Sequence, residues 1–289
     1  MEVLLMLDIN SLQLQHYKES EVFATICMIS FEDRALKTAR LAQEALELVR
    51  PKLKRDFEVT ICCDDFVQKE EDSSLVLAYC KSKDQDNVVL IPDFIFVNWK
   101  STGIDDYDKT VLGIYEASKI PPAYNTLFWI GATSHQSRNT LLKLAKKDKR
   151  IEAYDMSWKS SLPNHYANNT LNPSTRFVSL ADHTKYRYLI DIQGRGYSGR
   201  VKCLFFSGRP LFLAERKLYE WWQEDIHPFE HYIPVKEDLS DLSEKLDWAD
   251  SNPEECSQIA RNAQEYALNN LMHKNAVERM GEVLLTIGG

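Results

Sequence analysis

The sequence lacks a surplus of positive charge. Its 35 lysine and arginine residues are outnumbered by 43 aspartate and glutamate residues, for a formal net charge of −8. Nucleic acids and anionic membranes are bound through clustered cations. The composition therefore excludes a general nucleic-acid surface, permits a local basic pocket, and leaves only peripheral membrane association open.

Long apolar runs are also missing. No uncharged stretch reaches the roughly 20 residues that a membrane-spanning helix needs. The N-terminal run MEVLLMLDIN has no basic start and meets Asp8 early, unlike a secretory signal peptide. These absences predict a cytoplasmic protein without a transmembrane segment.

The six cysteines include no Cys-x-x-Cys pair, and they lie in apolar runs rather than in loops. This placement predicts reduced, buried thiols rather than a disulfide framework or a zinc site. Asp106 and Asp108 form an Asp-x-Asp pair of the kind that can hold a divalent cation. They lie in the acidic stretch STGIDDYDKT without a preceding β-branched strand, so we interpret them as solvated surface.

What the chain does have is the length and the apolar content of a folded α/β protein. It has 289 residues, of which 44% are hydrophobic, and this favours two α/β domains over one. In the first half, apolar spacing predicts a helix over 32–50 that Pro51 ends. Three apolar, β-branched runs predict strands at 57–63, 74–80 and 88–92.

The second half alternates strands and helices more clearly. Pro121 and Pro122 mark the expected boundary, because neither can continue a helix or a central strand. This order predicts a parallel sheet with helices on its faces. The expected strands are 127–130, 150–155, 186–192, 210–214 and 231–235, and the expected helices are 137–147, a short one after residue 200, 217–223 and most of 239–287. A polar loop is expected at 157–176.

We therefore expect domains at 1–120 and 121–272, with a terminal helix at 273–289 returning to the first domain. Trp221, Trp222 and Phe229 are expected in the core, with sugar stacking as the less favoured alternative.

A glycine triplet follows the strand at 186–192. Gly194, Gly196 and Gly199 form Gly-x-Gly-x-x-Gly, interleaved with Arg195 and Arg200. Such a turn between strand and helix can offer backbone N–H groups to a phosphate. The two arginines favour a diphosphate that gains charge as it leaves, since guanidinium pairs bidentately with phosphate oxygens.

Two other interpretations of the triplet stay open. A nicotinamide dinucleotide site would use an acidic residue about 20 positions on, and Glu215 or Glu220 lies near that distance. The triplet could also be a plain turn with surface arginines. The short helix after the triplet argues against the dinucleotide.

The run from Asp182 to Leu239 resembles glycosyltransferase family 90, the family of lipopolysaccharide-modifying, capsule-associated and protein O-glucosyltransferases. The matching features are the Lys-Tyr-Arg-Tyr strand 185–188, Ser198 with Arg200 and Lys202, Ser207-Gly208, Glu220, and the HYIPV run leading to Asp238-Leu239. Upstream, LFWIGATSHQSR resembles the family's strand that lines the nucleotide, with Ile130 where an arginine is usual.

The resemblance implies a GT-B-like α/β fold of two Rossmann-type domains with a cleft between them, with the donor nucleotide on the C-terminal half and the acceptor on the N-terminal half. It assigns Ser198, Arg200 and nearby amides to the phosphates and Glu220 to the ribose hydroxyls. His183 either touches the nucleotide or has a structural role. The full donor-binding set is Gly131, Ala132, His183, Gly196, Tyr197, Ser198, Gly199, Arg200, Lys202 and Glu220.

The segment DFEVTICCDDF at 56–66 resembles the strand that ends in the family's catalytic aspartate. The gapless match puts the general base on Asp65, with Asp64 as the fallback, whereas residue type alone would favour a turn-forming pair. No metal cofactor is implied, because arginine charge would serve the diphosphate instead.

The implied function is inverting transfer of glucose, galactose or xylose from a UDP-sugar to a hydroxyl of a surface glycan, such as lipopolysaccharide or capsule. A non-catalytic nucleotide-sugar binder is the first alternative, motivated by Ile130. An NAD-dependent oxidoreductase, motivated by the glycine triplet, is the second.

Overall fold

The chain folds into two compact units, each with its own sheet. The computed structural model describes residues 5–8, 11–15, 24–29, 32–55, 57–67, 75–133, 135–156 and 177–289. The polar loop expected at 157–176 lies outside them. The first unit comprises Met1–Asp108, Lys217–Gln223 and Leu271–Gly289, and the second comprises Lys109–Arg216 and Glu224–Asn270.

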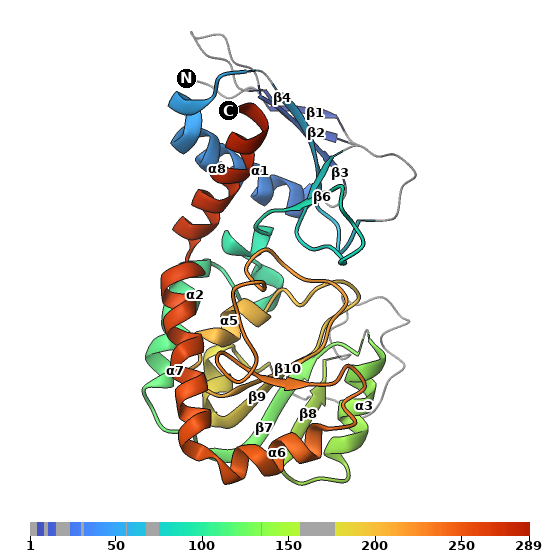
Figure 1. The fold of residues 1–289 in the computed structure, drawn as a ribbon, viewed down its shortest axis with the longest axis vertical. Helices are drawn as coiled ribbons and strands as arrows, with labels where there is room; N and C mark the ends of the chain where they lie inside the picture. The colour runs from blue at the N-terminus through green and yellow to red at the C-terminus, as the bar shows by residue number, and fades with distance from the viewer. Residues whose placement is uncertain are drawn as a thin grey trace. The chain divides into compact units, whose positions relative to one another are not determined.

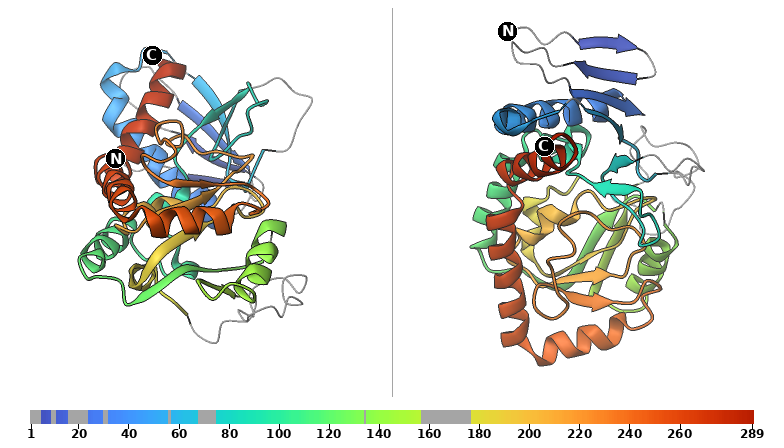
Figure 2. Two further views of the ribbon diagram at one scale, coloured as in Figure 1. Left: turned by 60° about the horizontal axis from the view of Figure 1, so that its bottom comes forward. Right: turned by 45° about the horizontal axis from the view of Figure 1, so that its top comes forward.

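The first unit contains a six-stranded sheet in the order β1-β2-β3-β4-β5-β6 (Figures 1 and 2). The first three strands pair antiparallel, and β3 through β6 pair parallel. Phe57, Val59 and Ile61 of β4 point into the core, as alternation along a strand requires. The strands are β1 Leu5–Asp8, β2 Ser11–Gln15, β3 Ala24–Ile29, β4 Phe57–Cys62, β5 Val76–Ala78 and β6 Val88–Leu90.

Two helices pack together in this unit. The apolar stripe of α1 (Glu32–Val49) is buried, and the terminal helix α8 (His273–Gly288) lies against α1 (Figure 1). Gly281 permits the close approach, since a Cβ there would stand 2.8 Å from Cγ1 of Val49. The terminal helix therefore belongs to the first unit.

The second unit contains a five-stranded sheet in the order β11-β10-β9-β7-β8, with every pair parallel. Helix α3 packs on β8, α6 packs on β11, and α7 packs on α5. The strands are β7 Tyr124–Gly131, β8 Ile151–Asp155, β9 Tyr186–Asp191, β10 Leu211–Ala214 and β11 Ile233–Val235, and the helices are α2 Tyr107–Ser118, α3 Gln136–Ala145, α5 Val201–Phe205, α6 Leu242–Ser251 and α7 Pro253–Asn270. The α/β class and the parallel sheet are confirmed.

The helix expected at 217–223 is wrong. Tyr219 instead forms an antiparallel bridge with Lys81, and the two residues exchange N–H···O bonds of 3.1 and 3.0 Å. This backbone pairing outweighs the local helical preference of the segment. Phe229 is also not in the core: 46% of it is exposed, at a positive φ of 61°, whereas Trp222 is fully buried.

Asp106 is exposed just before α2, as expected for solvated surface, whereas Asp108 is in the first turn of α2. The Asp108 carboxylate accepts the backbone N–H of His273 at 2.9 Å, which gives it a structural role. His227 and His231 have the i, i+4 spacing of some metal ligands, but Nδ1 of His231 accepts the backbone N–H of His227. Within the described ranges, no group of three His, Cys, Asp or Glu side chains could hold a metal ion.

The described cysteine side chains are free thiols. Cys63, Cys80, Cys203 and Cys256 are buried, as expected, and Cys62 is partly exposed; the side chain of Cys27 lies outside the described residues. No helix in the described part of the chain is long and apolar enough to span a bilayer.

Candidate functional site

A buried aspartate organises the carboxyl edge of the second sheet. Asp191 ends β9, which lies between β7 and β10, so residues that follow neighbouring strands converge on it. Its carboxylate accepts Ser198 Oγ–H at 2.8 Å and Arg200 Nε–H at 3.3 Å through Oδ1. Oδ2 accepts Arg216 Nη2–H at 3.1 Å. One carboxylate thus holds the glycine-rich loop and two arginines.

A third arginine reaches the same edge from α3. Arg138 donates to the Ala132 carbonyl at 2.9 Å and to the Ile192 carbonyl at 2.8 Å. Arg200 also donates to the Ile130 carbonyl. Ile130, near the end of β7, stands where the family usually has an arginine. Two guanidinium groups from other elements therefore contact this strand end.

The indole of Trp129 contacts both guanidinium groups. The guanidinium carbons of Arg138 and Arg200 lie 5.6 and 5.5 Å from its ring centroid, within cation–π range. Gly131 makes room for the ring, because a Cβ there would stand 2.9 Å from the indole. We therefore assign Gly131 to packing around Trp129.

Positive charge exceeds negative charge in this cluster, with three guanidinium groups against the carboxylate of Asp191. Burial, and then the charges of Arg200 and Arg216 against the opposing charge of Asp191, lower the pKa of Arg138 to about 10. Like charges held this close make the edge attractive to an anion.

Within the described part of the chain, the buried polar atoms of this region that have no partner include Arg216 Nη1, His183 Nε2 and Trp129 Nε1. His183 Nδ1 lies 2.7 Å from the Ser179 carbonyl and donates to it. Burial, and then the charge of Arg200, lowers the pKa of His183 to about 4, so the ring is neutral and Nε2 is an acceptor. A ligand could satisfy a donor and an acceptor here.

The glycine triplet lacks two features that favour a phosphate cradle. None of Gly194, Gly196 and Gly199 has a positive φ, and α5 that follows has only five residues, too few for a substantial helix dipole. The loop is instead tied to Asp191 through Ser198 and Arg200. These two features also do not favour the dinucleotide alternative.

Three further candidates from the sequence, Lys202, Glu220 and Glu215, lie in different surroundings. Lys202 is buried, its Nζ donates to the Gly199 carbonyl at 3.0 Å, and it lies over the half-buried ring of Tyr197. Glu220 is buried in the 217–223 segment of the first unit. Glu215, at the end of β10, lines a hollow of about 640 Å³ in the second unit together with His135 and Lys236.

Asp64 and Asp65 have different contacts at the end of β4. Asp64 Oδ1 accepts the backbone N–H of Asp65 at 2.6 Å, which stabilises the turn. Asp65 Oδ1 accepts Nη1–H of Arg34 at 2.8 Å, and about a third of its side chain (34%) is exposed. Asp65 therefore has an accessible, oriented carboxylate, and Asp64 has a local structural task.

Solved glycosyltransferases share this architecture. Anabaena HepE in complex with UDP and glucose superposes with a TM-score of 0.51 at 12% identity, over 86% of this chain and 76% of that one. Sucrose-phosphate synthase from Thermosynechococcus elongatus gives 0.50 at 9% identity, over 87% and 76%. The fold is that of the GT-B glycosyltransferases.

The sequence then defines the family. The model of Glycosyl transferase family 90 matches residues 18–286, and this chain belongs to that family. Protein O-glucosyltransferase 1 of Rattus norvegicus is 32% identical over 152 residues, which is 51% of this chain and 37% of that protein. Protein O-glucosyltransferase 2 of Danio rerio is 32% identical over 148 residues, 51% of this chain and 29% of that protein. The matches thus span well under half of each curated relative.

Proposed function

We propose that this protein is an inverting glycosyltransferase that moves glucose, galactose or xylose from a UDP-sugar to a hydroxyl group. The observation that carries the proposal is the arginine cluster around Asp191, in which Arg216 Nη1 is a buried donor without a partner in the described structure. Membership of a glycosyltransferase family gives that anion site its substrate class.

The arginine cluster suits a departing diphosphate. Negative charge grows on the leaving group as the bond to the anomeric carbon breaks, and preorganised cations stabilise that change most. We assign this task to Arg200 and Arg216, with Arg138 adding positive potential. Guanidinium charge in this position serves the role that a divalent cation has in other glycosyltransferases. His183 Nε2 would accept a hydroxyl or N–H of the nucleotide.

Asp65 is proposed as the base that takes the proton from the acceptor hydroxyl, with Asp64 as the fallback. Its ion pair with Arg34 fixes the carboxylate orientation, as an oriented proton acceptor requires. The first proposed acceptor class is a surface glycan of the lipopolysaccharide or capsule type. The second is a protein hydroxyl, because the curated relatives are named protein O-glucosyltransferases.

A non-catalytic binder is the alternative that Ile130 motivated. Arg200 and Arg138 bring guanidinium groups to the carbonyls of Ile130 and Ala132, so an arginine at position 130 is not needed to place charge there. This observation favours an active enzyme.

The test is UDP release from UDP-glucose, UDP-galactose and UDP-xylose, each with oligosaccharide acceptors and with serine-containing protein domains. Asp65→Asn should lower kcat by about 100-fold or more, the usual loss of a general base, while UDP still binds. Asp64→Asn is the matched control and should cost less than about ten-fold, because an amide oxygen still accepts the Asp65 N–H. The reverse ranking would move the base to Asp64, and UDP binding without turnover on any pair would contradict the enzymatic proposal.

A further inference from the structure

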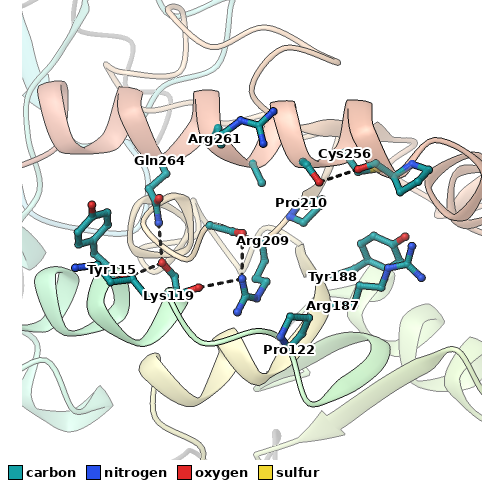
Figure 3. Close-up of a pocket in the computed structure, with 15 residues that line it drawn as sticks. Tyr115, Lys119, Pro122, Arg187, Tyr188, Arg209, Pro210, Cys256, Arg261 and Gln264 are labelled. Atoms are coloured by element: carbon teal, nitrogen blue, oxygen red, sulfur yellow. Dashed lines mark hydrogen bonds between the residues drawn. The ribbon is translucent and has the colours of Figure 1, made fainter.

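The second unit has another pocket, away from the carboxyl edge of its sheet. It encloses about 460 Å³, a volume typical of small-molecule sites. Arg187 and Tyr188 lie in the first half of β9, and Pro122 and Pro210 come just before β7 and β10, so the pocket lies at the amino edge. Figure 3 shows Arg261, Gln264 and Cys256 on α7 on one side and Arg209 and Lys119 on the other.

The pocket is strongly basic. Its described lining includes Lys119, Arg187, Arg209 and Arg261 and no carboxylate. Lys119 pairs with Glu116 at 2.7 Å, and Arg187 pairs with Asp250 at 3.1 Å. Among the described residues no carboxylate pairs with Arg209 or Arg261. Positive charge is therefore in excess.

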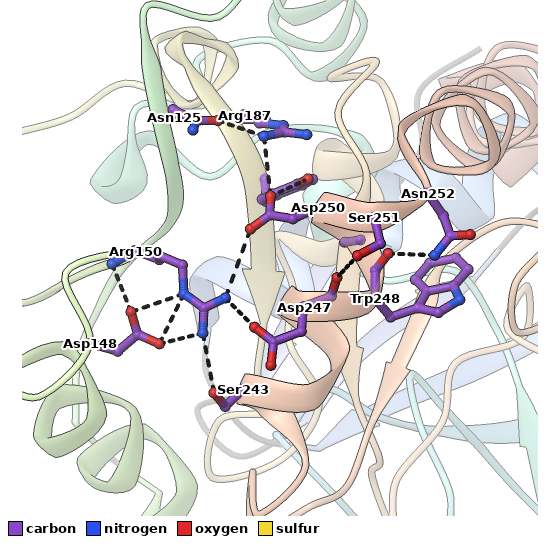
Figure 4. Close-up of polar contacts among 12 residues, drawn as sticks. Asn125, Asp148, Arg150, Arg187, Ser243, Asp247, Trp248, Asp250, Ser251 and Asn252 are labelled. Carbon is purple, nitrogen blue, oxygen red and sulfur yellow. Dashed lines mark hydrogen bonds and ion pairs between the residues drawn. The ribbon is translucent and has the colours of Figure 1, made fainter.

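The carboxylate nearest Arg187 is shared among several groups. Asp250 also accepts the hydroxyl of Tyr188 at 3.0 Å and lies 3.8 Å from Arg150, as Figure 4 shows. Arg150 itself pairs with Asp148 and Asp247. Because Arg150 is already matched by Asp148 and Asp247, Asp250 compensates Arg187, and the excess positive charge of the pocket comes from Arg209 and Arg261.

The buried cation of the pocket is fixed in place. Arg209 donates to the carbonyls of Thr184 at 2.8 Å and Ser118 at 3.2 Å, with a further bond to Ile120, and only 9% of it is exposed. Carbonyl partners orient a guanidinium without cancelling its charge. Pro253, Cys256 and Ser257 of the first turn of α7 also line the pocket.

We propose that this amino-edge pocket binds a small phosphate-bearing molecule, at a second site separate from the one around Asp191. Arg261 and Lys119 supply movable charge at the rim, Arg209 supplies fixed charge at the base, and Tyr115 and Tyr188 provide walls for the uncharged part of the ligand. The volume exceeds what a single phosphate group fills, so the ligand carries an organic portion. The inference is independent of the proposed transferase activity.

The experiment is calorimetric titration of the full chain with inorganic pyrophosphate, in the absence and presence of saturating UDP. Binding should persist under UDP. Arg261→Gln should weaken it about five- to ten-fold, the loss of one charge-assisted hydrogen bond, and Ser257→Glu should abolish it by placing a carboxylate in the pocket. Both positions are exposed on α7, so neither change disturbs the core.

Lys147→Gln is the matched control, an exposed cation outside the pocket, and should leave the affinity unchanged. Pyrophosphate binding that UDP fully displaces, and that neither α7 variant alters, would overturn the proposal, as would the absence of binding. The α7 variants report on this pocket even if the chain binds no UDP. Failure of the pocket proposal and failure of the transferase proposal therefore give different results.

Discussion

Asp191 holds three groups that would be costly to leave unpaired. Ser198, Arg200 and Arg216 all bind its carboxylate, and its side chain is completely buried. Removing one partner of a buried ion pair typically costs about 3–5 kcal/mol, because the remaining charge is left without compensation. The cluster is therefore a rigid unit in which the position of each arginine depends on the others.

His183 makes stability depend on pH. Its pKa falls from 6.5 to about 4 on folding, mainly through burial, so the unfolded state binds the extra proton as pH drops below 6.5. Its contribution is present above pH 6.5 and is lost as pH falls toward 4. Between pH 7.5 and 5 the loss should amount to about 2 kcal/mol.

Chemical denaturation of wild type and His183→Gln across that pH range measures the effect. The variant should start less stable and lose about 2 kcal/mol less than wild type between pH 7.5 and 5. His227→Gln, at an exposed histidine, should keep the wild-type slope. Parallel pH profiles for wild type and His183→Gln would show that His183 is not buried in its neutral form.

The sequence identified part of this site but not its centre. Ser198 and Arg200 were found because they lie in a recognisable motif, and the structure places both at Asp191. Arg138 and Arg216 were missed because Arg138 is a single arginine on a helix and Arg216 a single arginine after a strand. Only the parallel sheet brings them together. Asp191 was visible as a lone acid ending an apolar strand, a signal that could have marked it.

At the scale of elements, His273, the first residue of α8, bonds this helix to the rest of the first unit. His273 Nε2 lies 2.7 Å from Glu44 on α1, and Nδ1 lies 2.8 Å from the Phe96 carbonyl, so both nitrogens face acceptors. Burial alone would lower the pKa of His273, but these bonds and the charge of Glu44 outweigh it and raise the pKa. The pKa of Glu44 is lowered, since its bonds to His273 and Arg40 outweigh burial.

Glu44→Gln should therefore destabilise the protein by about 0.5–1 kcal/mol at pH 6, allowing for solvent screening of a partly exposed pair. The raised pKa of His273 means that this contribution is full below pH 6.5 and fades as pH rises past the folded value. The lowered pKa of Glu44 means that it also fades as pH falls below about 4.5. Urea denaturation at pH 6 and pH 8.5 measures the loss on the alkaline side. Glu47→Gln, on the same helix, should be neutral, and an equal loss at both pH values would contradict the ion pair.

Elements with strong periodic patterns were predictable, and those made by long-range pairing were not. The helix at 32–49 and strands β7 to β11 follow apolar spacing and β-branched runs. The 217–223 segment failed because its conformation depends on Lys81, more than 130 positions earlier in the chain. Strands β1 to β3 and helix α2 were not predicted from the sequence.

For the whole molecule, the family resemblance in the sequence was confirmed over residues 18–286, and the GT-B fold follows from the solved structures. Physical patterns alone had left a dinucleotide site open, and the family motifs pointed to a UDP-sugar instead. The structure adds Arg138 and Arg216 to Arg200, which the motif had already assigned to the diphosphate. The sugar and the acceptor depend on side-chain details that the motifs do not specify.

The most direct test of the account is calorimetric titration with UDP and with uridine, for wild type and for Arg216→Gln and Arg216→Lys. UDP affinity should fall about ten-fold or more in the glutamine variant, since one charge-assisted contact to the diphosphate is lost, while uridine binding stays unchanged. The lysine variant keeps the charge beside Asp191 and should show an intermediate loss. Lys147→Gln, at an exposed cation outside the cluster, is the control. UDP affinity equal to wild type in both folded Arg216 variants would contradict the claim that this cluster holds the diphosphate.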